Sequence, residues 1–309
     1  MASIVGMGTA VPSNRLTNSD LEQMLDTSDK WIVERTGIRE RRIAGPEDNT
    51  MTLATAACAE ALKDSEIDPE LIDVLVVATV TPVQKLPATS ALVQDALGLH
   101  CGAFDLVAAC SGFVYALVTA DALVQSGGAR AALIVGAETL STIVDPDDRG
   151  TRILFGDGAA AAVLMPSKPG YGVLGFDLGC DGSAAGLLSI GPDEQYIHME
   201  GSEVFRRAVR ACIQSANNAM ERAGVTAKDI DRFVPHQANN RIIDAIIERF
   251  GIAEEKTLRN IDKYGNTSAA SIPLALAEAE PNEGDLVLTC GFGAGMTWAS
   301  AVIRWGVGA

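Results

Sequence analysis

The chain repeats part of its own sequence, and this internal duplication constrains its fold more than any other feature. Residues 61–76 resemble residues 219–234 at a constant offset of 158 residues, and in both copies an amphipathic stretch leads into a β-rich segment. A second, weaker echo pairs residues 132–136 with residues 287–291, each a predicted strand after an alanine-rich helix. Two echoes in the same order predict two similar halves of alternating helices and strands, which is typical of a mixed α/β fold. Because no Pro/Ser-rich linker separates the halves, we expect them to share one core.

The composition indicates a globular chain and limits its partners. Its 309 residues are 48% hydrophobic, and the apolar stretches are interrupted before the roughly 18 residues that a membrane span needs. With no basic and apolar leader before Ile4, we expect a cytoplasmic protein that does not enter a membrane. The net charge of −16 argues against nucleic-acid affinity, so an anionic ligand must meet a local basic patch. The six cysteines have neither metal-ligand nor disulfide spacing, and we predict free thiols and no metal site.

Cys110 is the candidate nucleophile. It lies where an apolar strand, predicted over residues 103–109, turns into a long amphipathic stretch that begins at Ser111. A thiol at that junction would stand at a helix N-terminus, where unpaired N–H groups and the helix dipole stabilise a thiolate. The pattern therefore predicts a lowered pKa for Cys110. The alternative is a buried structural cysteine at the end of a core strand.

Two further polar residues lie at predicted junctions in the second half. An apolar run that ends at Pro235 delivers His236 to a strand end, which is where α/β enzymes place catalytic groups. Asn266 lies in a turn of glycine and small polar residues before a helix, although an ordinary N-cap would have the same pattern. Residues 291–295 form a glycine-rich segment after the strand predicted over residues 286–289. This segment permits close approach of the backbone to a substrate, or forms a plain turn.

Taken in order, these motifs resemble the thiolase superfamily, and most closely the β-ketoacyl-acyl carrier protein synthase III family. The resemblance covers nearly the whole chain and rests on residues 31–42, 108–113, 148–151, 155–158, 235–239 and 265–271 and on the C-terminal glycine loop. It implies a five-layered αβαβα thiolase fold of two duplicated halves, assembled as a homodimer. We expect the first half, residues 1–168, to carry the nucleophile. The second half, residues 169–309, would carry the histidine and the asparagine.

The Cys-His-Asn catalytic set of the family falls on Cys110, His236 and Asn266. The resemblance implies that Cys110 takes an acyl group from an acyl-CoA primer, which then condenses with malonyl-acyl carrier protein as carbon dioxide is lost, initiating fatty acid synthesis. Two neutral donors, His236 and Asn266, suit the enolate that forms in this step. The backbone N–H groups of Cys110 and Ala294 resemble the oxyanion hole for the acyl-enzyme carbonyl. No cofactor is expected, because the CoA thioester is itself a substrate.

Related chemistries differ from this one at single positions. A biosynthetic thiolase has a second cysteine, but aligning the glycines puts that position at Gly291, and strand alternation turns Cys290 to the opposite face. A hydroxymethylglutaryl-CoA synthase would have glutamate at Val80. Type III polyketide synthases share the Cys-His-Asn set but lack the His-Gln-Ala-Asn run. A polyketide-starter ketosynthase and an acyltransferase of secondary metabolism stay open as alternatives, whereas the intact catalytic set argues against a non-enzymatic partner of the carrier protein.

A basic cluster near Trp31 predicts where CoA binds. Positive charge is concentrated at Arg35, Arg39, Arg41 and Arg42, a patch that could hold phosphates unless it is a solvated run paired with nearby glutamates. By resemblance, Trp31 and Arg149 flank the CoA adenine and Arg35 helps to hold its phosphates. The residues that would line the pantetheine tunnel are Gly201, Phe205, Ala238 and Asn239.

The resemblance also assigns an acyl pocket and a docking surface. Leu86 would reach across the dimer to the end of the partner's acyl pocket, and the predicted wall residues are Phe155, Leu188 and Ile197. The surface expected to bind the acidic acyl carrier protein consists of Arg206, Arg241 and Arg249.

Overall fold

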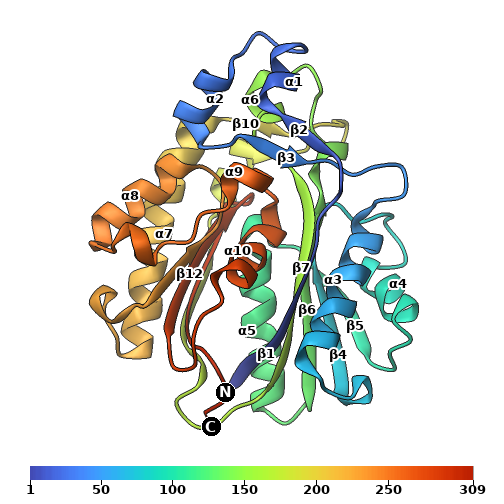
Figure 1. Ribbon diagram of the computed structural model, residues 1–309, viewed down its shortest axis with the longest axis vertical. Coiled ribbons are helices and arrows are strands. Elements are labelled where there is room, and N and C mark those ends of the chain that lie inside the picture. Colours follow the sequence, from blue (N-terminus) through green and yellow to red (C-terminus); the bar gives the residue numbers. More distant parts are fainter. Residues whose placement is uncertain (309) are drawn as a thin grey trace.

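Two stacked β-sheets form the frame of the computed structural model, which describes residues 1–308 (Figure 1). Within that range the first sheet has the strand order β1-β7-β6-β4-β5 and the second has the order β11-β12-β13-β8. The strands of the first sheet are β1 (Ala2–Ala10), β4 (Ile72–Ala78), β5 (Gly102–Leu106), β6 (Ala131–Thr139) and β7 (Asp157–Pro166). The strands of the second sheet are β8 (Gly172–Cys180), β11 (Arg232–Pro235), β12 (Leu286–Gly293) and β13 (Thr297–Arg304).

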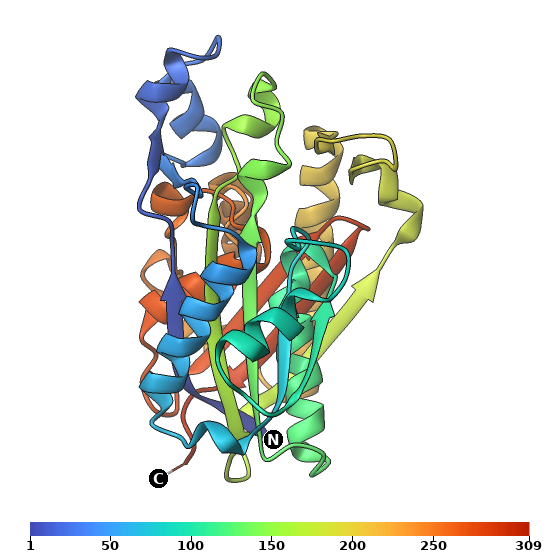
Figure 2. The same ribbon diagram turned by 90° about the vertical axis from the view of Figure 1, so that its right-hand side faces the viewer.

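Helices cover the outer faces of both sheets and fill the space between them (Figures 1 and 2). The outer helices of the first sheet are α3 (Thr50–Ser65) and α4 (Thr89–Ala96), and those of the second are α7 (Gly201–Ala223) and α8 (Asn240–Phe250). The central layer consists of α5 (Gly112–Gln125) and α10 (Ser271–Ala279). This arrangement is the expected five-layered αβαβα fold.

Smaller elements form a cap at the upper end of the sheets in Figure 1. They are β2 (Arg15–Thr17), β3 (Glu40–Arg42), α1 (Asn18–Glu22), α2 (Asp29–Thr36), α6 (Arg149–Arg152) and α9 (Ile261–Tyr264), with the hairpin of β9 (Leu188–Ser189) and β10 (His198–Met199). Cys110 and Asn266 lie where the central helices meet this cap. None of the helices within residues 1–308 is both long and apolar enough to cross a membrane.

The two halves share a core, as their sequence predicts. The largest apolar cluster lies around α5 and contains Val76 and Ile134 from the first half together with Val234 and Ile272 from the second. The division expected between residues 168 and 169 falls in the turn that joins β7 to β8. It stays a prediction, because a shared core does not by itself fix a boundary.

Both sequence echoes correspond to repeated structure, but two predicted strands have different ends. The first echo pairs α3 and β4 with α7 and β11, and the second pairs β6 with β12. The strand expected over residues 103–109 ends at Leu106, because the chain leaves the sheet before Ala109, whose φ is 46°. The strand expected to end at Thr289 continues to Gly293, so part of the glycine-rich segment is strand rather than turn.

Arg41 does not belong to a surface patch, contrary to the sequence-based prediction. Alternation along β3 turns its side chain inward, where it is fully buried. Its guanidinium donates hydrogen bonds to the Leu16 and Ile153 carbonyl oxygens and to Asn18 Oδ1, at 2.7 to 3.0 Å. Burial lowers the pKa of Arg41 to about 10, which leaves the side chain charged at neutral pH. Arg41 therefore ties the cap to the segment that precedes β7.

Replacing Arg41 with leucine should destabilise the fold strongly. The change leaves three buried acceptors without donors, at about 1 to 3 kcal/mol each, so the free energy of unfolding should fall by about 3 kcal/mol or more. Denaturant unfolding followed by circular dichroism measures this loss. The control is Arg39→Leu, which changes an exposed side chain of the same run and should stay within about 0.5 kcal/mol of wild type. Equal stabilities of the two variants would contradict the anchoring role.

Candidate active site

Cys110 occupies a short 3₁₀ turn, η2 (Ala109–Ser111), that leads directly into α5. The turn packs against β12 so closely that a Cβ built on Gly293 would lie 2.5 Å from the Cys110 backbone nitrogen. Only a glycine at that position permits this approach. Cys110 is 7% exposed and lines two cavities.

The pKa of Cys110 is shifted in the direction opposite to the sequence-based prediction. Burial raises it to about 12, and the negative charge of Glu138 adds to the increase, while the Ser268 hydroxyl opposes it. A helix N-terminus does follow the thiol, but the sequence could not show how deeply the thiol is buried. In the absence of substrate, Cys110 is therefore a protonated thiol, and any reaction through its sulfur requires a group that takes its proton.

His236 lies directly after β11, and its ring is held from two sides. Its backbone N–H donates to the Cys290 carbonyl oxygen at 2.8 Å, and its Nδ1 lies 2.5 Å from Ser271 Oγ. Nε2 is buried and has no hydrogen-bond partner within residues 1–308. Burial lowers the pKa of His236 to about 3, so the ring is neutral at physiological pH. In the neutral tautomer in which Ser271 donates to Nδ1, the proton is on Nε2, which is then a donor at the cavity that His236 lines.

Asn266 is fixed by both its backbone and its side chain. Its backbone donates to the Leu154 carbonyl oxygen at 2.8 Å and accepts from the Gly156 N–H at 3.0 Å. Its side-chain oxygen, Oδ1, accepts from the backbone N–H of Ser268 at 2.9 Å. Because Oδ1 is occupied, the amide group of Asn266 is available as a donor in the cavity that also contains Cys110 and His236.

The first cavity, of about 530 Å³, connects these three residues with the surface near α2. It is lined by six of the seven residues predicted to contact CoA: Trp31, Arg35, Gly201, Phe205, Ala238 and Asn239. The seventh, Arg149, does not line it but lies over the Trp31 ring at 4.9 Å, and Arg35 lies over the same ring at 4.8 Å. An adenine placed between Trp31 and Arg149 would therefore have to displace the Arg149 guanidinium. Of the predicted basic cluster, only Arg35 lines this cavity.

The second cavity, of about 360 Å³, is mainly apolar and shares Cys110, Phe155 and Leu188 with the first. Its lining includes Ala294 and the three predicted wall residues, Phe155, Leu188 and Ile197. Leu86 does not line it, since this side chain is 85% exposed. Sequence reasoning missed further apolar wall residues, namely Val80, Val107, Leu140, Ile143 and Ile190. They come from separate loops and carry no common sequence signal.

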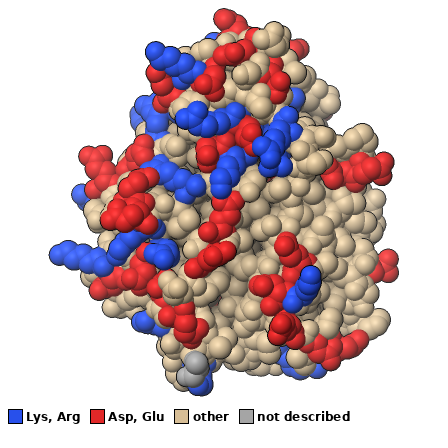
Figure 3. Space-filling model, in the orientation of Figure 1, with Lys and Arg blue, Asp and Glu red and all other residues tan. Residues whose placement is uncertain are grey.

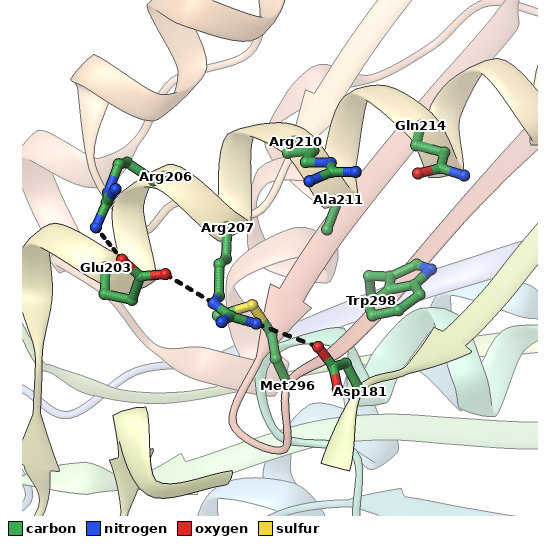
Figure 4. Close-up of a pocket in the computed structure, with 9 residues that line it drawn as sticks. All are labelled: Asp181, Glu203, Arg206, Arg207, Arg210, Ala211, Gln214, Met296 and Trp298. Carbon is green, nitrogen blue, oxygen red and sulfur yellow. Dashed lines mark hydrogen bonds and ion pairs between the residues drawn. The ribbon is translucent and has the colours of Figure 1, made fainter. Parts of the chain in front are cut away.

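The predicted carrier-protein surface is basic only in part. Arg206, Arg241 and Arg249 are all exposed, on α7 and α8. Arg206 is paired with Glu203, which also binds Arg207 in a neighbouring pocket (Figure 4). Arg241 lies over the Phe205 ring at 5.6 Å, at the rim of the first cavity. Basic and acidic side chains alternate over the upper part of this face (Figure 3), so the surface has no uniform positive field.

Cys290 lies outside the site, as strand alternation predicts. It is buried in the core of the second half beside Cys212. The neighbouring residue Gly291 faces the site instead, since a Cβ built there would lie 3.2 Å from the Cys110 carbonyl oxygen. Gly291, where aligning the glycines puts the second cysteine of thiolases, therefore faces the site and carries no thiol.

Two buried polar residues near Cys110 were not recognised in the sequence. Glu138 is the penultimate residue of an apolar strand, and an acidic residue near the end of a central strand of an α/β sheet is a usable signal. Ser268 follows Asn266 in the same turn, and only its φ of 48° sets it apart. Glu138 raises the pKa of Cys110, and Ser268 lowers it.

Known families and structures match nearly the whole chain. Residues 104–182 match the family described as 3-oxoacyl-[acyl-carrier-protein (ACP)] synthase III, and residues 220–305 match its C-terminal family. The β-ketoacyl-[acyl-carrier-protein] synthase III of Desulfitobacterium hafniense is 48% identical over 321 residues, which covers 98% of this chain and 97% of that protein.

Two solved structures extend this similarity to the fold. The β-ketoacyl-[acyl carrier protein] synthase III of Thermus thermophilus has a TM-score of 0.96 at 48% identity, over 99% of both chains. A priming β-ketosynthase from a polyketide biosynthetic pathway has a TM-score of 0.95 at 37% identity, over 100% of this chain and 97% of that one. With sequence and fold in agreement along nearly its whole length, the chain belongs to the β-ketoacyl-acyl carrier protein synthase III family.

Proposed function

We propose that this chain condenses an acyl-CoA primer with malonyl-acyl carrier protein, with loss of carbon dioxide, and so initiates fatty acid synthesis. One observation carries the proposal: a single cavity contains a buried thiol, Cys110, and two neutral donors, His236 and Asn266. These groups match the two halves of the reaction. The thiol holds the acyl group, and the donors stabilise the enolate.

In the first half-reaction, the Cys110 sulfur attacks the thioester carbonyl and CoA leaves as a thiol. One thioester replaces another, so the step is close to thermoneutral. The backbone N–H groups of Cys110 and Ala294 stabilise the oxyanion of the tetrahedral intermediate. The acyl chain then occupies the second cavity, whose apolar lining suits it.

In the second half-reaction, the malonyl thioester oxygen accepts hydrogen bonds from His236 Nε2 and the Asn266 amide. Loss of carbon dioxide leaves the electron pair at C2, delocalised onto this oxygen as an enolate. The carbon then attacks the acyl-Cys110 carbonyl, and the Cys110 thiolate leaves. A neutral histidine suits this role, because a donor is needed and no proton has to be transferred. The chemistry uses no cofactor.

The entrance of the first cavity suits both predicted substrates. Trp31 and Arg35 at one end are suited to the CoA nucleotide. Arg206, Arg241 and Arg249 form the proposed docking surface for the acyl carrier protein that carries the malonyl group. The pairing of Arg206 with Glu203 leaves Arg241, at the cavity rim, as the main contact.

A homodimer would complete the acyl cavity. Strand β5 is an edge of the first sheet, and Phe104 on it and Val107 after it are 38% and 76% exposed. Val107 also lines the second cavity, so one wall of that cavity faces the same surface. A second copy against β5 would cover these side chains and bring Leu86 to the partner's cavity. A polyketide-starter role, as in the 37% identical ketosynthase, would use the same catalytic residues and differ in the primer.

Replacing Cys110 with alanine should abolish acyl transfer and condensation but retain malonyl decarboxylation, since the two steps use different groups. Intact-protein mass spectrometry after incubation with acyl-CoA should show an adduct on wild type and none on Cys110→Ala. The control, Cys180→Ala, removes an exposed thiol and should keep the adduct. An undiminished adduct on Cys110→Ala would rule out the assigned nucleophile.

Replacing His236 or Asn266 with alanine should spare most acylation of Cys110 but impair condensation. Loss of one oxyanion donor typically costs about 2.7 to 4 kcal/mol, which is about a hundred- to a thousandfold in rate. Release of labelled carbon dioxide from malonyl-acyl carrier protein measures the loss. The control is Asn260→Ala, which removes a buried amide that does not line the cavity. Condensation at the wild-type rate in either site variant is the outcome that excludes enolate stabilisation by that residue.

Leu86 should limit primer length. Leu86→Phe should disfavour longer or branched primers and Leu86→Ala should admit them, because the side chain fills space at the end of the partner's pocket. Each methylene is worth about 1 to 3 kcal/mol, so preference should shift by about ten- to two-hundredfold. The measurement is kcat/KM over an acyl-CoA series, with the dimer checked by light scattering and Met24→Ala as an exposed apolar control. Unchanged profiles in intact dimers would remove Leu86 from the pocket.

A further inference from the structure

Glu138 is a wholly buried carboxylate that the proposed mechanism does not use. It is the penultimate residue of β6, and its Oε2 accepts hydrogen bonds from Thr81 Oγ1 at 2.6 Å and from Thr79 Oγ1 and the Val80 N–H at 3.1 Å each. Within residues 1–308, no lysine, arginine or histidine forms an ion pair with it. A carboxylate held only by neutral donors is costly to bury, so its retention needs a reason.

Ser268 is the side chain that acts on the pKa of both Glu138 and Cys110. Ser268 lines the second cavity together with Cys110, and its hydroxyl is buried. Within residues 1–308 this hydroxyl has no hydrogen-bond partner, although interaction with Ser268 lowers the pKa of both Cys110 and Glu138. It is therefore free to turn toward either group.

The fold holds Ser268 in this position under strain. Its φ of 48° is in the left-handed region, which a serine adopts only when its surroundings impose it. The turn η7 (Ser268–Ala270) packs on β6 at Gly136, where a Cβ would lie 2.2 Å from the Ala269 carbonyl oxygen. The contact at Gly136 is two residues from Glu138, so the turn that carries Ser268 packs on the strand that carries this carboxylate.

The proton of Cys110 needs an acceptor, and His236 does not suit the task. Burial lowers the pKa of His236 to about 3, and its Nδ1 already contacts Ser271. Burial raises the pKa of Glu138 to about 7, because it outweighs the hydrogen bonds from Thr81, Val80, Ser268 and Thr79. A carboxylate with that pKa is ionised in part at neutral pH and holds a proton well once it has received it.

We propose that Glu138 takes up the Cys110 proton through the Ser268 hydroxyl during acyl transfer. Ser268 Oγ accepts the proton from Cys110 Sγ as its own proton passes to Glu138, which leaves a thiolate and a neutral carboxylic acid. The thiolate attacks the thioester carbonyl, and the bond between that carbon and the CoA sulfur breaks. The departing CoA thiolate receives the proton from Glu138 through the Ser268 hydroxyl, and Glu138 is again a carboxylate. This inference rests on the proposed acylation of Cys110.

Few other titratable groups surround this path. The turn η2 contributes Cys110 itself, and β11 leads to His236, which is neutral. The neighbouring strand β7 contributes Asp157, whose carboxylate accepts hydrogen bonds from Ser141 and from the Ala44 N–H. Burial raises the pKa of Asp157 as well, so a pH profile must be assigned with variants of both acids.

The first test compares acylation with alkylation of the same thiol. The rate of Cys110 acylation is measured by rapid-quench mass spectrometry. The substrate is acetyl-CoA, or whichever of isobutyryl-CoA and octanoyl-CoA acylates wild type faster. Glu138→Gln and Ser268→Ala should each lower this rate about a hundredfold or more. The double variant should be no slower than the singles, because both changes interrupt one path. Alkylation by iodoacetamide should stay as fast or become faster in Glu138→Gln, since loss of the negative charge favours the thiolate.

A pH profile provides the second readout. Wild-type acylation should rise with pH through about 7 as Glu138 ionises, and this rise should be absent in Glu138→Gln and retained in Asp157→Asn. Malonyl decarboxylation should persist in Glu138→Gln and in Ser268→Ala, which shows that each variant retains its folded donor site.

Three results would contradict either the proton relay or the proposed function. Acylation of Glu138→Gln or Ser268→Ala at or above the wild-type rate would overturn the relay. Equal slowing of acylation and alkylation would also overturn it, because a structural disturbance of the Cys110 turn would be sufficient. Absence of any adduct on wild-type Cys110 would instead contradict the proposed function.

Discussion

Two close contacts between a turn and a glycine hold the halves of this protein in register, and the site depends on both. The turn that carries Cys110 packs on Gly293 of β12, where a Cβ would lie 2.5 Å from the Cys110 nitrogen. The turn after Asn266 packs on Gly136 of β6, where a Cβ would lie 2.2 Å from the Ala269 carbonyl oxygen. Each half thus presses the start of its central helix onto a strand in the middle of a sheet. A side chain at either glycine would displace a turn and with it a functional group.

The duplication gives the two turns the same geometry and different chemistry. Each begins with a residue of positive φ, Ala109 at 46° and Ser268 at 48°, and the next position is Cys110 in one half and Ala269 in the other. The thiol therefore comes from one half only. The other half supplies the donors, with Asn266 held by the Ser268 N–H in the same strained turn. Burial at the contact of the two halves makes His236 a neutral donor and keeps Cys110 protonated, so one physical cause sets both protonation states.

The sequence predicts the layers and the residue types of this site better than its electrostatics. Duplication, strand ends and the motif order lead to the fold and to the meeting of Cys110, His236 and Asn266. These sequence patterns do not show how deeply a side chain is buried. The helix start at Cys110 predicts a lowered pKa for the thiol, whereas its burial raises that pKa. The burial of Arg41 is equally hidden, because its run of arginines resembles a surface patch. Only the packing of the fold shows that its guanidinium donates hydrogen bonds to three buried acceptors. Leu86 stays a prediction, because its role requires a second copy of the chain.

We infer that burial makes Cys110 a resting thiol, so that acyl transfer needs a proton acceptor. The most direct measurement is the pH titration of thiolate absorbance in the far ultraviolet, taken on the ligand-free enzyme as the difference between wild type and Cys110→Ala. We expect the Cys110 thiolate to appear only well above the pKa of a free cysteine, about 8.5. A thiolate already formed below about pH 7.5 would contradict it, because the helix N-terminus would then outweigh burial.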